Sequence, residues 1–365
     1  MLFQIDRDSF LDGLTKTVPI SEKRTPLPIL SHILMNVDES HLVLTATDLE
    51  VGLKITSEAA VQEPGMLAVP SKKLYEIVRE LLPGQVTVKS TETQRILIES
   101  GESVFELAGM DATDYPAWTT GKEVETAQVQ ASRLLYMIDK TMFAASTDDS
   151  RFNLNGILFE KEGEEHIKLV ATDGHRLALI HGELGIRPVS NVIVPRKGLA
   201  ELKRLLESLK GEISLGFEEK NLFVSTDRLM MTVRLIDGDF PDYRKVIPEP
   251  SDTIVRVPHS QFTHTLRRVA ILTSDRNKGV NIKVSSGKME LKTTHPDLGT
   301  ARDVMDVEYS GEEFLVIVNA AYLIEAVGVI DTDSVSIEFR EEGAPVILRP
   351  IPSKDYFNLV MPMRK

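Results

Sequence analysis

The feature that most constrains this chain is an internal repeat with an offset of 125 residues. The stretch LAVPSKKLYEIVREL at 67–81 recurs as VIVPRKGLAELKRLL. Asp48 and Pro116 recur at the same offset as Asp173 and Pro241. Self-similarity at a fixed period is the signature of a repeated structural unit, so three landmarks at one offset indicate that the chain is built from copies of one fold.

A fainter third copy follows, because FLVIVNAAYLIEAVGVI at 314–330 matches the same helical landmark. The three copies open with LFQIDRDSFLDGLTKTV, AQVQASRLLYMIDKTM and IVRVPHSQFTHTLRRVAIL, each typical of a short strand followed by an amphipathic helix. The segments TTGKEVE and IPEPSD resemble linkers between the copies. We therefore predict three domains, at residues 1–122, 126–247 and 251–365.

Within each copy a strand, a helix and several strands follow one another, and the same order then occurs a second time. Segments such as QVTVKS, RILIES and SVFELAG alternate apolar and polar residues, which favours half-buried antiparallel strands. The expected fold class is α+β, with two helices per domain packed on antiparallel sheets. The six helices are predicted at 7–18, 71–82, 131–143, 195–210, 258–271 and 319–330.

Several kinds of chemistry are missing from the sequence. The chain has no cysteine, which excludes disulfides, thiolate nucleophiles and cysteine-ligated metals. It also lacks GxxxxGK[ST], GxGxxG, GxSxG and HExxH motifs, so we predict no cofactor, no metal site and no catalytic residues. Asp237 and Asp239 in DGDFPDYR could bind a metal, but the proline favours a structural turn. No apolar run approaches a membrane span and MLFQIDRDSF is charged, so a cytoplasmic protein without a membrane partner is expected.

The best enzymatic candidate is ATDGHR, in which Asp173 and His175 could act as an acid–base pair. The corresponding segment ATDLEV keeps the aspartate but has no histidine. This difference favours a turn in which the aspartate accepts hydrogen bonds from its own backbone. A binding surface formed by Gly174, His175 and Arg176 is the main alternative.

The net charge of −13, taken as an average, speaks against a nucleic-acid binder. The six predicted helix segments carry +6, however, so the rest of the chain carries −19. If the helices share one face, that face is positive and suits phosphate contacts without base readout. The alternative is that lysines and arginines only cover solvated helix faces.

The segments LTATDLE, VATDGHRLA, VPRKGL, DGDFPDYR and above all LVMPMRK resemble the bacterial sliding clamps, the β subunits of DNA polymerase III. The resemblance covers the full chain. It implies a head-to-tail homodimer that closes into a ring, with helices lining the hole and sheets outside. Such a ring encircles double-stranded DNA without sequence preference and tethers the replicative polymerase. It also implies binding of the clamp loader and other partners through peptides, a nucleoid-associated cytoplasmic location and no catalytic activity of its own.

The resemblance also implies three sets of site residues. The positions facing DNA are Arg24, Lys72, Lys73, Arg151, Arg196 and Lys197. The pocket for partner peptides lies between the second and third domains and uses Leu154, Thr172, Gly174, His175, Arg176, Leu177, Pro241, Val246, Val360, Met361, Pro362, Met363 and Arg364. At the dimer interface, Phe105 and Leu107 meet Ile271 and Leu272 of a second copy.

The chain departs from the family pattern at three of its positions. Phe152 and Asn153 stand where many relatives have paired tyrosines, and Lys245 stands where an arginine is frequent. A lysine cannot make the bidentate contact of an arginine. Two other functions stay open from the residues alone: a repeat-built enzyme using Asp173 and His175, and an acidic scaffold that does not bind DNA.

Overall fold

The computed structural model describes residues 1–363 except 22–26, 118–123, 164–165, 186–189, 219, 252, 275–277, 341–342 and 353. The chain divides into two compact units. Unit 1 comprises Met1–Ser132 and Lys197–Leu235, and unit 2 comprises Arg133–Arg196 and Ile236–Lys365. Each unit therefore combines parts of two sequence repeats, with the second repeat divided between them.

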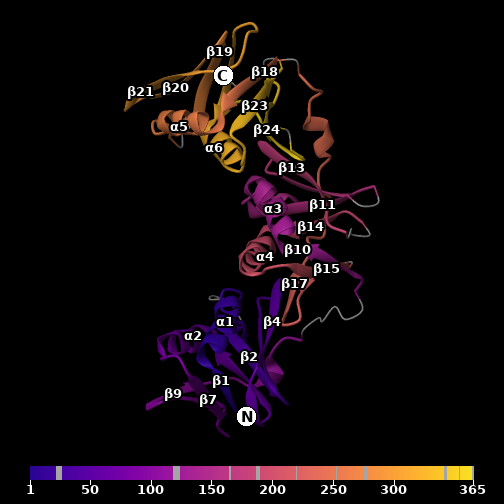
Figure 1. The fold of residues 1–365 in the computed structure, drawn as a ribbon, viewed down its shortest axis with the longest axis vertical. Coiled ribbons are helices and arrows are strands. Elements are labelled where there is room, and N and C mark those ends of the chain that lie inside the picture. The colour runs from indigo at the N-terminus through magenta and orange to yellow at the C-terminus, as the bar shows by residue number, and fades with distance from the viewer. Residues whose placement is uncertain are drawn as a thin grey trace. The chain divides into compact units, whose positions relative to one another are not determined.

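Unit 1 contains an antiparallel sheet of eight strands in the order β10–β15–β16–β17–β4–β3–β2–β6. Four strands come from the second repeat: β10 (Thr126–Gln130), β15 (Glu212–Glu218), β16 (Asn221–Ser225) and β17 (Leu229–Arg234). The other four come from the first: β4 (Val51–Glu58), β3 (His41–Thr47), β2 (His32–Asp38) and β6 (Gly65–Pro70). The sheet therefore crosses the boundary between repeats at the pair β17–β4, which we call seam 1 (Figure 1).

A second sheet of unit 1 belongs to the first repeat alone and has the order β5–β1–β7–β8–β9. Its strands are β1 (Leu2–Asp6), β5 (Ala60–Glu63), β7 (Gln85–Ser90), β8 (Arg95–Ser100) and β9 (Ser103–Ala108). Strand β9 lies at the edge of this sheet, and most of its side chains are exposed.

Unit 2 repeats this architecture. Its eight-stranded sheet has the order β14–β11–β12–β13–β25–β24–β23–β18, and the repeats meet at β13–β25, which we call seam 2. The strands are β14 (Val192–Pro195), β11 (Gly156–Glu162), β12 (His166–Thr172), β13 (Arg176–Glu183), β25 (Tyr356–Val360), β24 (Val346–Ile351), β23 (Ser334–Phe339) and β18 (Thr253–Pro258). A four-stranded sheet adds β21 (Gly299–Asp306), β20 (Lys288–His295), β19 (Gly279–Ser285) and β22 (Phe314–Asn319), with β21 at its edge.

The described residues form six α-helices, and all six predicted segments are confirmed. They are α1 (Arg7–Thr17), α2 (Ser71–Glu80), α3 (Ala131–Thr141), α4 (Arg196–Ser208), α5 (His259–Ala270) and α6 (Ala320–Gly328). Helix α1 begins where the Asp6 side chain accepts hydrogen bonds from two backbone amides. Its Phe10 and Leu14, four residues apart, are fully buried on one face.

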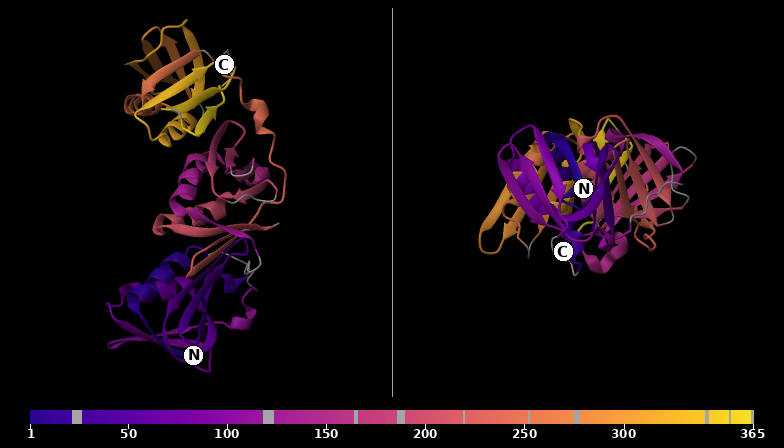
Figure 2. Two further views of the ribbon diagram at one scale, coloured as in Figure 1. Left: turned by 45° about the vertical axis from the view of Figure 1, so that its right-hand side comes forward. Right: turned by 90° about the horizontal axis from the view of Figure 1, so that it is seen from below.

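Two pairs of helices, α1 with α2 and α5 with α6, pack against sheets of their own unit. Helix α1 contacts α2, β3 and β4, and α5 contacts α6, β20 and β21. Figure 1 shows α5 and α6 together on one side of the strands of the third repeat. In the left view of Figure 2 the segment with the short 3₁₀ helix η5 (Tyr243–Val246) runs from the second repeat to the third. The α+β class with helices on antiparallel sheets is confirmed.

Helix α4 approaches its sheet closely through a glycine. A Cβ added at Gly198 would stand 2.2 Å from a methyl group of Val233 on β17. We expect Gly198→Ala to lower the free energy of unfolding by about 1–3 kcal/mol, because overpacking outweighs the better helix propensity of alanine. Chemical denaturation would measure the change. Gly328→Ala in α6 is the matched control, since its Cβ meets nothing within 4 Å and should not destabilise the chain; equal losses in both would contradict the packing argument.

Candidate functional site: the groove at seam 2

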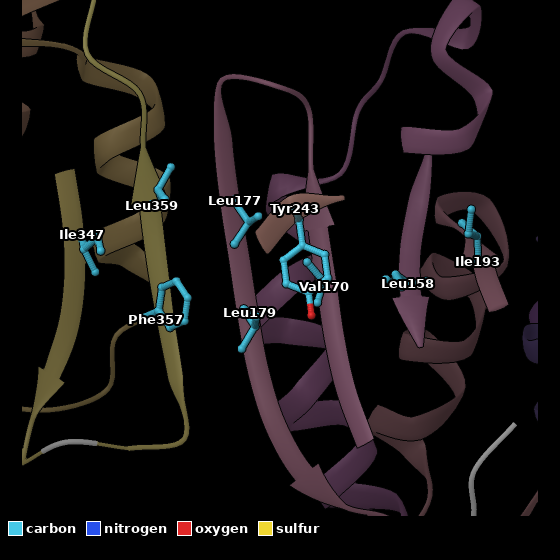
Figure 3. Close-up of a cluster of buried hydrophobic side chains, with 9 residues drawn as sticks. All are labelled: Leu158, Val170, Leu177, Leu179, Ile193, Tyr243, Ile347, Phe357 and Leu359. Carbon is cyan, nitrogen blue, oxygen red and sulfur yellow. The ribbon is translucent and has the colours of Figure 1, made fainter. Parts of the chain in front are cut away.

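A hydrophobic cluster fills seam 2. Leu177 and Leu179 of β13 lie beside Phe357 and Leu359 of β25, and Tyr243 of η5 joins the same cluster next to Val170 (Figure 3). Met361, Phe240 and Ile247 are partly buried and pack against this cluster. Burial of apolar side chains from both repeats holds the two sides of the seam together.

The turn between β12 and β13 forms one end of the groove. Asp173 Oδ1 accepts hydrogen bonds from the backbone amides of His175 at 2.9 Å and Arg176 at 3.1 Å. Thr172 Oγ1 accepts one from the amide of Gly174 at 3.1 Å and donates to the Arg176 carbonyl at 2.6 Å. The interpretation of Asp173 as a turn aspartate is confirmed, and Gly174 supplies the positive φ of 87° that the turn needs.

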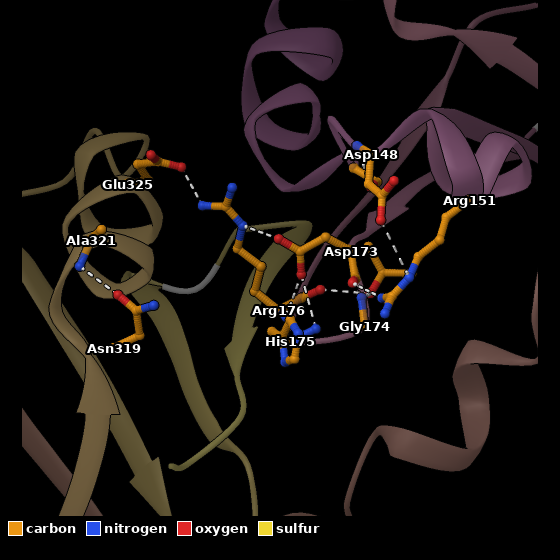
Figure 4. Close-up of polar contacts among 11 residues, drawn as sticks. Asp148, Arg151, Asp173, Gly174, His175, Arg176, Asn319, Ala321 and Glu325 are labelled. Atoms are coloured by element: carbon orange, nitrogen blue, oxygen red, sulfur yellow. Dashed lines mark hydrogen bonds and ion pairs between the residues drawn. The ribbon is translucent and has the colours of Figure 1, made fainter. Parts of the chain in front are cut away.

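Arg176 joins the two repeats. Its Nε donates to Asp173 Oδ2 at 3.0 Å, and its Nη1 donates to Glu325 of α6 (Figure 4). The guanidinium also lies 4.5 Å from the centre of the Tyr322 ring and 5.5 Å from that of Phe143. Only 10% of the side chain is exposed. The pKa of Tyr322 is raised by burial and by the negative charge of Asp173. The arginine therefore fixes the wall of the groove rather than presenting a free charge.

The C-terminal segment forms the opposite wall. The amide of Met361 donates to the carbonyl of His175 at 2.8 Å, and the amide of Met363 donates to that of Ile317 at 2.8 Å. The segment is thus attached to the second repeat on one side and to the third on the other. The His175 imidazole stacks on the Tyr322 ring at 6.2 Å between centroids.

The predicted pocket residues divide by exposure. Gly174, His175, Pro241, Val246 and Met363 are exposed, and Met361, Pro362 and Arg176 are intermediate. Four others are buried: Leu154, Thr172, Leu177 and Val360. Arg364 lies outside the described residues. Most of the described members thus lie at or beside seam 2, where methionine and aliphatic side chains would suit an adaptable peptide site.

A buried carboxylate holds the FPDYR segment in place. Glu160 of β11 is 5% exposed and accepts hydrogen bonds from Tyr243 Oη at 3.0 Å and from Arg244 Nη2. Burial and the negative charge of Glu160 raise the pKa of Tyr243. These contacts fix η5 and so the positions of Pro241 and Val246 at the rim.

A second polar contact joins the repeats behind the groove. The Lys140 ammonium of α3 lies 3.4 Å from Asp331 and donates to the carbonyl of Val329. The rings of Tyr136 and Tyr356 flank it at 4.7 and 4.9 Å. Burial lowers the pKa of Lys140, and the negative charge of Asp331 offsets only part of this effect.

The predicted DNA-facing residues differ in their surroundings. Lys72 and Lys73 lie on α2 with largely exposed side chains, near Glu76 at 3.8 and 2.7 Å. Lys197 is bound by Asp48 at 2.8 Å and Glu50 at 3.0 Å, so its charge is matched locally. Burial opposes the charged form of Lys197, but these hydrogen bonds outweigh it and raise its pKa.

Three other predicted DNA contacts fall in different settings. Arg151 donates to the carbonyl of Asp173 at 3.1 Å and lies 3.9 Å from Asp148 (Figure 4). Arg196, at the start of α4, is partly buried, and its Nε has no hydrogen-bond partner among the described residues. Arg24 lies outside the described residues.

The departures from the family pattern are also placed. The ring of Phe152 is exposed and lies beside Gly238, and Asn153 Nδ2 donates to the Asp239 carbonyl at 3.0 Å. Lys245 is exposed, with its ammonium 3.4 Å from Asp242.

The predicted dimer residues lie on an edge strand of unit 1 and directly after a helix of unit 2. Phe105 is exposed and Leu107 half-buried on the edge strand β9. Ile271, directly after α5, is 76% exposed, and Leu272 is half-buried.

In the described part of the chain, no group of three or more histidine and acidic side chains is placed to hold a metal ion, and Asp237 and Asp239 take part in none. None of the described helices is long and apolar enough to cross a membrane.

Sequence reasoning missed the partners that hold the groove: Tyr322, Glu325, Glu160 and Lys140. Glu325 lies on α6, and the predicted segment for this helix is the only one of the six with a negative formal charge. That charge is the one sequence feature that could have pointed to Glu325. The others depend on contacts between repeats that no local pattern reveals.

Comparison with known proteins places the chain in one family. Family models of the DNA polymerase III beta subunit match residues 1–119 (N-terminal domain), 128–242 (central domain) and 244–364 (C-terminal domain). The beta sliding clamps of Pseudomonas aeruginosa and Escherichia coli K12 are each 34% identical to it, with both chains fully covered. A crystal structure of the P. aeruginosa DNA polymerase III subunit beta matches with a TM-score of 0.95 at 34% identity, over both chains in full. A P. aeruginosa sliding clamp bound to griselimycin matches with 0.94 at 33%, also over both chains in full.

The Lys140 contact predicts a pH effect. Burial of the Asp331 carboxylate raises its pKa, but hydrogen bonding from Lys354 and the charge of Lys140 outweigh this effect and lower the pKa to about 2. A carboxylate with a depressed folded pKa stabilises the fold above its ordinary pKa of 3.8, and this contribution is lost as the pH falls toward 2. We expect Asp331→Asn to cost on the order of 1 kcal/mol at neutral pH, because Asp331 is partly exposed and screened.

Chemical denaturation at pH 6 and near pH 2.5 would test this, and the difference between wild type and Asp331→Asn should shrink at the lower pH. Asp333→Asn is the control, since this exposed neighbour makes no side-chain ion pair with the described residues. A difference independent of pH would contradict the ion-pair explanation.

Proposed function

Because this chain belongs to the DNA polymerase III beta-subunit family, we propose that it is a sliding clamp that encircles duplex DNA and tethers the replicative polymerase. The clamp raises processivity by keeping the enzyme at a high effective concentration near its template. It is an accessory subunit with no catalytic activity of its own. Its relatives carry the name beta sliding clamp, in agreement with this role.

The observation that carries the proposal is the repetition of the seams. Strand β17 of the second repeat pairs with β4 of the first, and β25 of the third pairs with β13 of the second. The strands that correspond to these are β9 in the first repeat and β21 in the third, and both are sheet edges. A second copy, placed head to tail, would pair β9 with β21 twice and close a ring in which neither strand remains an unpaired edge.

The apolar residues flanking these edges support the same interface. Phe105 and Leu107 on β9 would meet Ile271 and Leu272 beyond α5 of the partner subunit. Burial would explain why Ile271 stands exposed in the single chain. Apolar centres of this kind are typical of stable homodimer interfaces.

DNA contacts are assigned to six basic residues: Arg24, Lys72, Lys73, Arg151, Arg196 and Lys197. Several of these cations have carboxylate neighbours, so their attraction for phosphate is moderated. Weak contacts that do not read bases suit a ring that must slide.

Partner peptides are assigned to the groove at seam 2, lined by the described members of the predicted pocket and completed by Arg364. The replicative polymerase subunit, the clamp loader and other proteins would share this groove. Lys245 would offer a point charge where an arginine would make a bidentate contact. The site of action would be the cytoplasm, at the nucleoid.

Retention on DNA tests the topological function. After loading by a clamp loader onto nicked circular DNA, the protein should stay bound at salt that screens direct contacts. Linearising the same DNA should release it rapidly, because a ring slides off free ends. Equal dissociation from circular and linear DNA would contradict encirclement and favour an acidic scaffold or a direct binder.

The seams also predict the register of the dimer interface. Phe105 on β9 corresponds to Met231 on β17, and Ala301 on β21 corresponds to Leu53 on β4, which is paired with Met231. A Phe105→Cys, Ala301→Cys chain should therefore form intermolecular disulfides, since opposite residues of antiparallel strands have suitable Cα distances.

Non-reducing electrophoresis would measure the cross-link, and the chain has no native cysteine to compete. The control pairs Phe105→Cys with Arg302→Cys, one residue out of register and on the other face of the strand. Stronger cross-linking in the control would show that the register is wrong.

A further inference from the structure

Seam 1 repeats the turn that forms one end of the groove at seam 2. Thr47 Oγ1 accepts a hydrogen bond from the amide of Leu49 at 3.0 Å and donates to the Val51 carbonyl at 3.0 Å. Asp48 Oδ1 accepts from the amides of Glu50 at 3.0 Å and Val51 at 2.7 Å. These are the same four bonds that the turn between β12 and β13 makes.

The opposite wall is repeated as well. The amide of Arg234 donates to the carbonyl of Glu50 at 2.8 Å, as the amide of Met361 donates to that of His175 at 2.8 Å. Arg234 thus takes the place of Met361, because each follows directly the last residue that is paired across its seam, Val233 or Val360. The two seams therefore share the same pattern of turn and backbone hydrogen bonds but carry different side chains.

A hollow of about 350 Å³ lies at this place in unit 1. Leu49, Pro116, Thr232, Lys220 and Arg234 line it. Pro116 is the repeat counterpart of Pro241, so the hollow stands where the peptide groove stands at seam 2. We call it the seam 1 groove.

The seam 1 groove is positively charged where the seam 2 groove is apolar. Lys220 and Arg234 are both exposed, and no carboxylate among the described residues lies within ion-pair distance of either. Glu50 also lines the hollow, but its carboxylate is paired with Lys197 at 3.0 Å. An acidic ligand would therefore find two available cations beside an apolar surface.

Leu49 supplies that apolar surface, although its backbone conformation is strained. Its φ is 75°, in the left-handed region, where its counterpart in the second repeat is Gly174. A non-glycine residue there costs about 1–2 kcal/mol. The side chain is nevertheless 51% exposed, so it gains little from packing within the chain. The strain is explained if the leucine contacts a ligand.

We propose that the seam 1 groove is a second peptide-binding site, and that it takes an extended partner segment in which acidic and aliphatic residues alternate. The aliphatic side chains pack on Leu49 and Pro116, and the carboxylates bind Arg234 and Lys220. The inference rests on the proposed function in one respect: the ligand is taken to be a peptide because the seam 2 groove is proposed to bind peptides. Each chain then holds two proteins of different chemistry at neighbouring seams.

Fluorescence anisotropy of the full-length protein tests this with a labelled peptide of sequence Glu-Val-Asp-Leu-Glu-Val. At about 50 mM salt the wild type should bind it, and about 300 mM salt should weaken binding severalfold. Arg234→Glu should weaken binding at least tenfold, whereas Arg234→Lys should stay within about threefold. Leu49→Gly should weaken binding about three- to tenfold while unfolding stability stays equal or rises, which separates ligand contact from folding.

His175→Ala is the matched control at the seam 2 groove and should leave binding of this peptide unchanged. Three results would overturn the proposal: no binding to the wild type, loss of binding in His175→Ala alone, or equal binding by Arg234→Glu. Binding of a labelled DNA duplex that Arg234→Glu abolishes, without peptide binding, would assign the groove to nucleic acid instead. Retention on circular DNA should not change in Arg234→Glu, so failure here is distinct from failure of the clamp function.

Discussion

Backbone pairing across the boundaries between repeats is the interaction on which the rest of the structure depends. At β17–β4 and at β13–β25 the last strand of one repeat completes the sheet of the repeat before it. Each seam brings a turn whose aspartate, Asp48 or Asp173, accepts hydrogen bonds from backbone amides next to the segment at the end of the seam strand. The grooves are consequences of this pairing, because their two walls come from different repeats and meet only when the strands pair.

The ion pairs explain why the helices carry less effective charge than their composition indicates. Lys197 of α4 is held by Asp48 and Glu50, and Arg204 donates to the carbonyls of Thr15 and Lys16 at the end of α1. These cations of α4 therefore attach the second repeat to the first, and Arg204 also satisfies carbonyls that a helix end leaves free. The formal charge of +6 on the six helix segments is therefore an upper bound on the positive charge that DNA would meet.

The sequence was sufficient for the helices, the antiparallel strands and the turn role of Asp173, because amphipathic periodicity and turn chemistry are local. It did not reveal that the sheets continue through the repeat boundaries, since edge strands such as β9 and seam strands such as β17 have similar alternating patterns. The groove residues came from family resemblance, and most of the described ones do gather at seam 2. The contacts Arg176–Glu325 and Glu160–Tyr243 join distant segments, so only three-dimensional structure could supply them.

The two compact units are out of phase with the three sequence repeats, because the second repeat contributes strands to both. The seams do not depend on whether neighbouring repeats are joined by a peptide linker, since the same pair of strand edges meets in either case. A break in the linker near residue 250 would thus leave β13–β25 with all its hydrogen bonds and its apolar cluster. Covalent continuity sets which repeats are neighbours, whereas the strand edges set how they are joined.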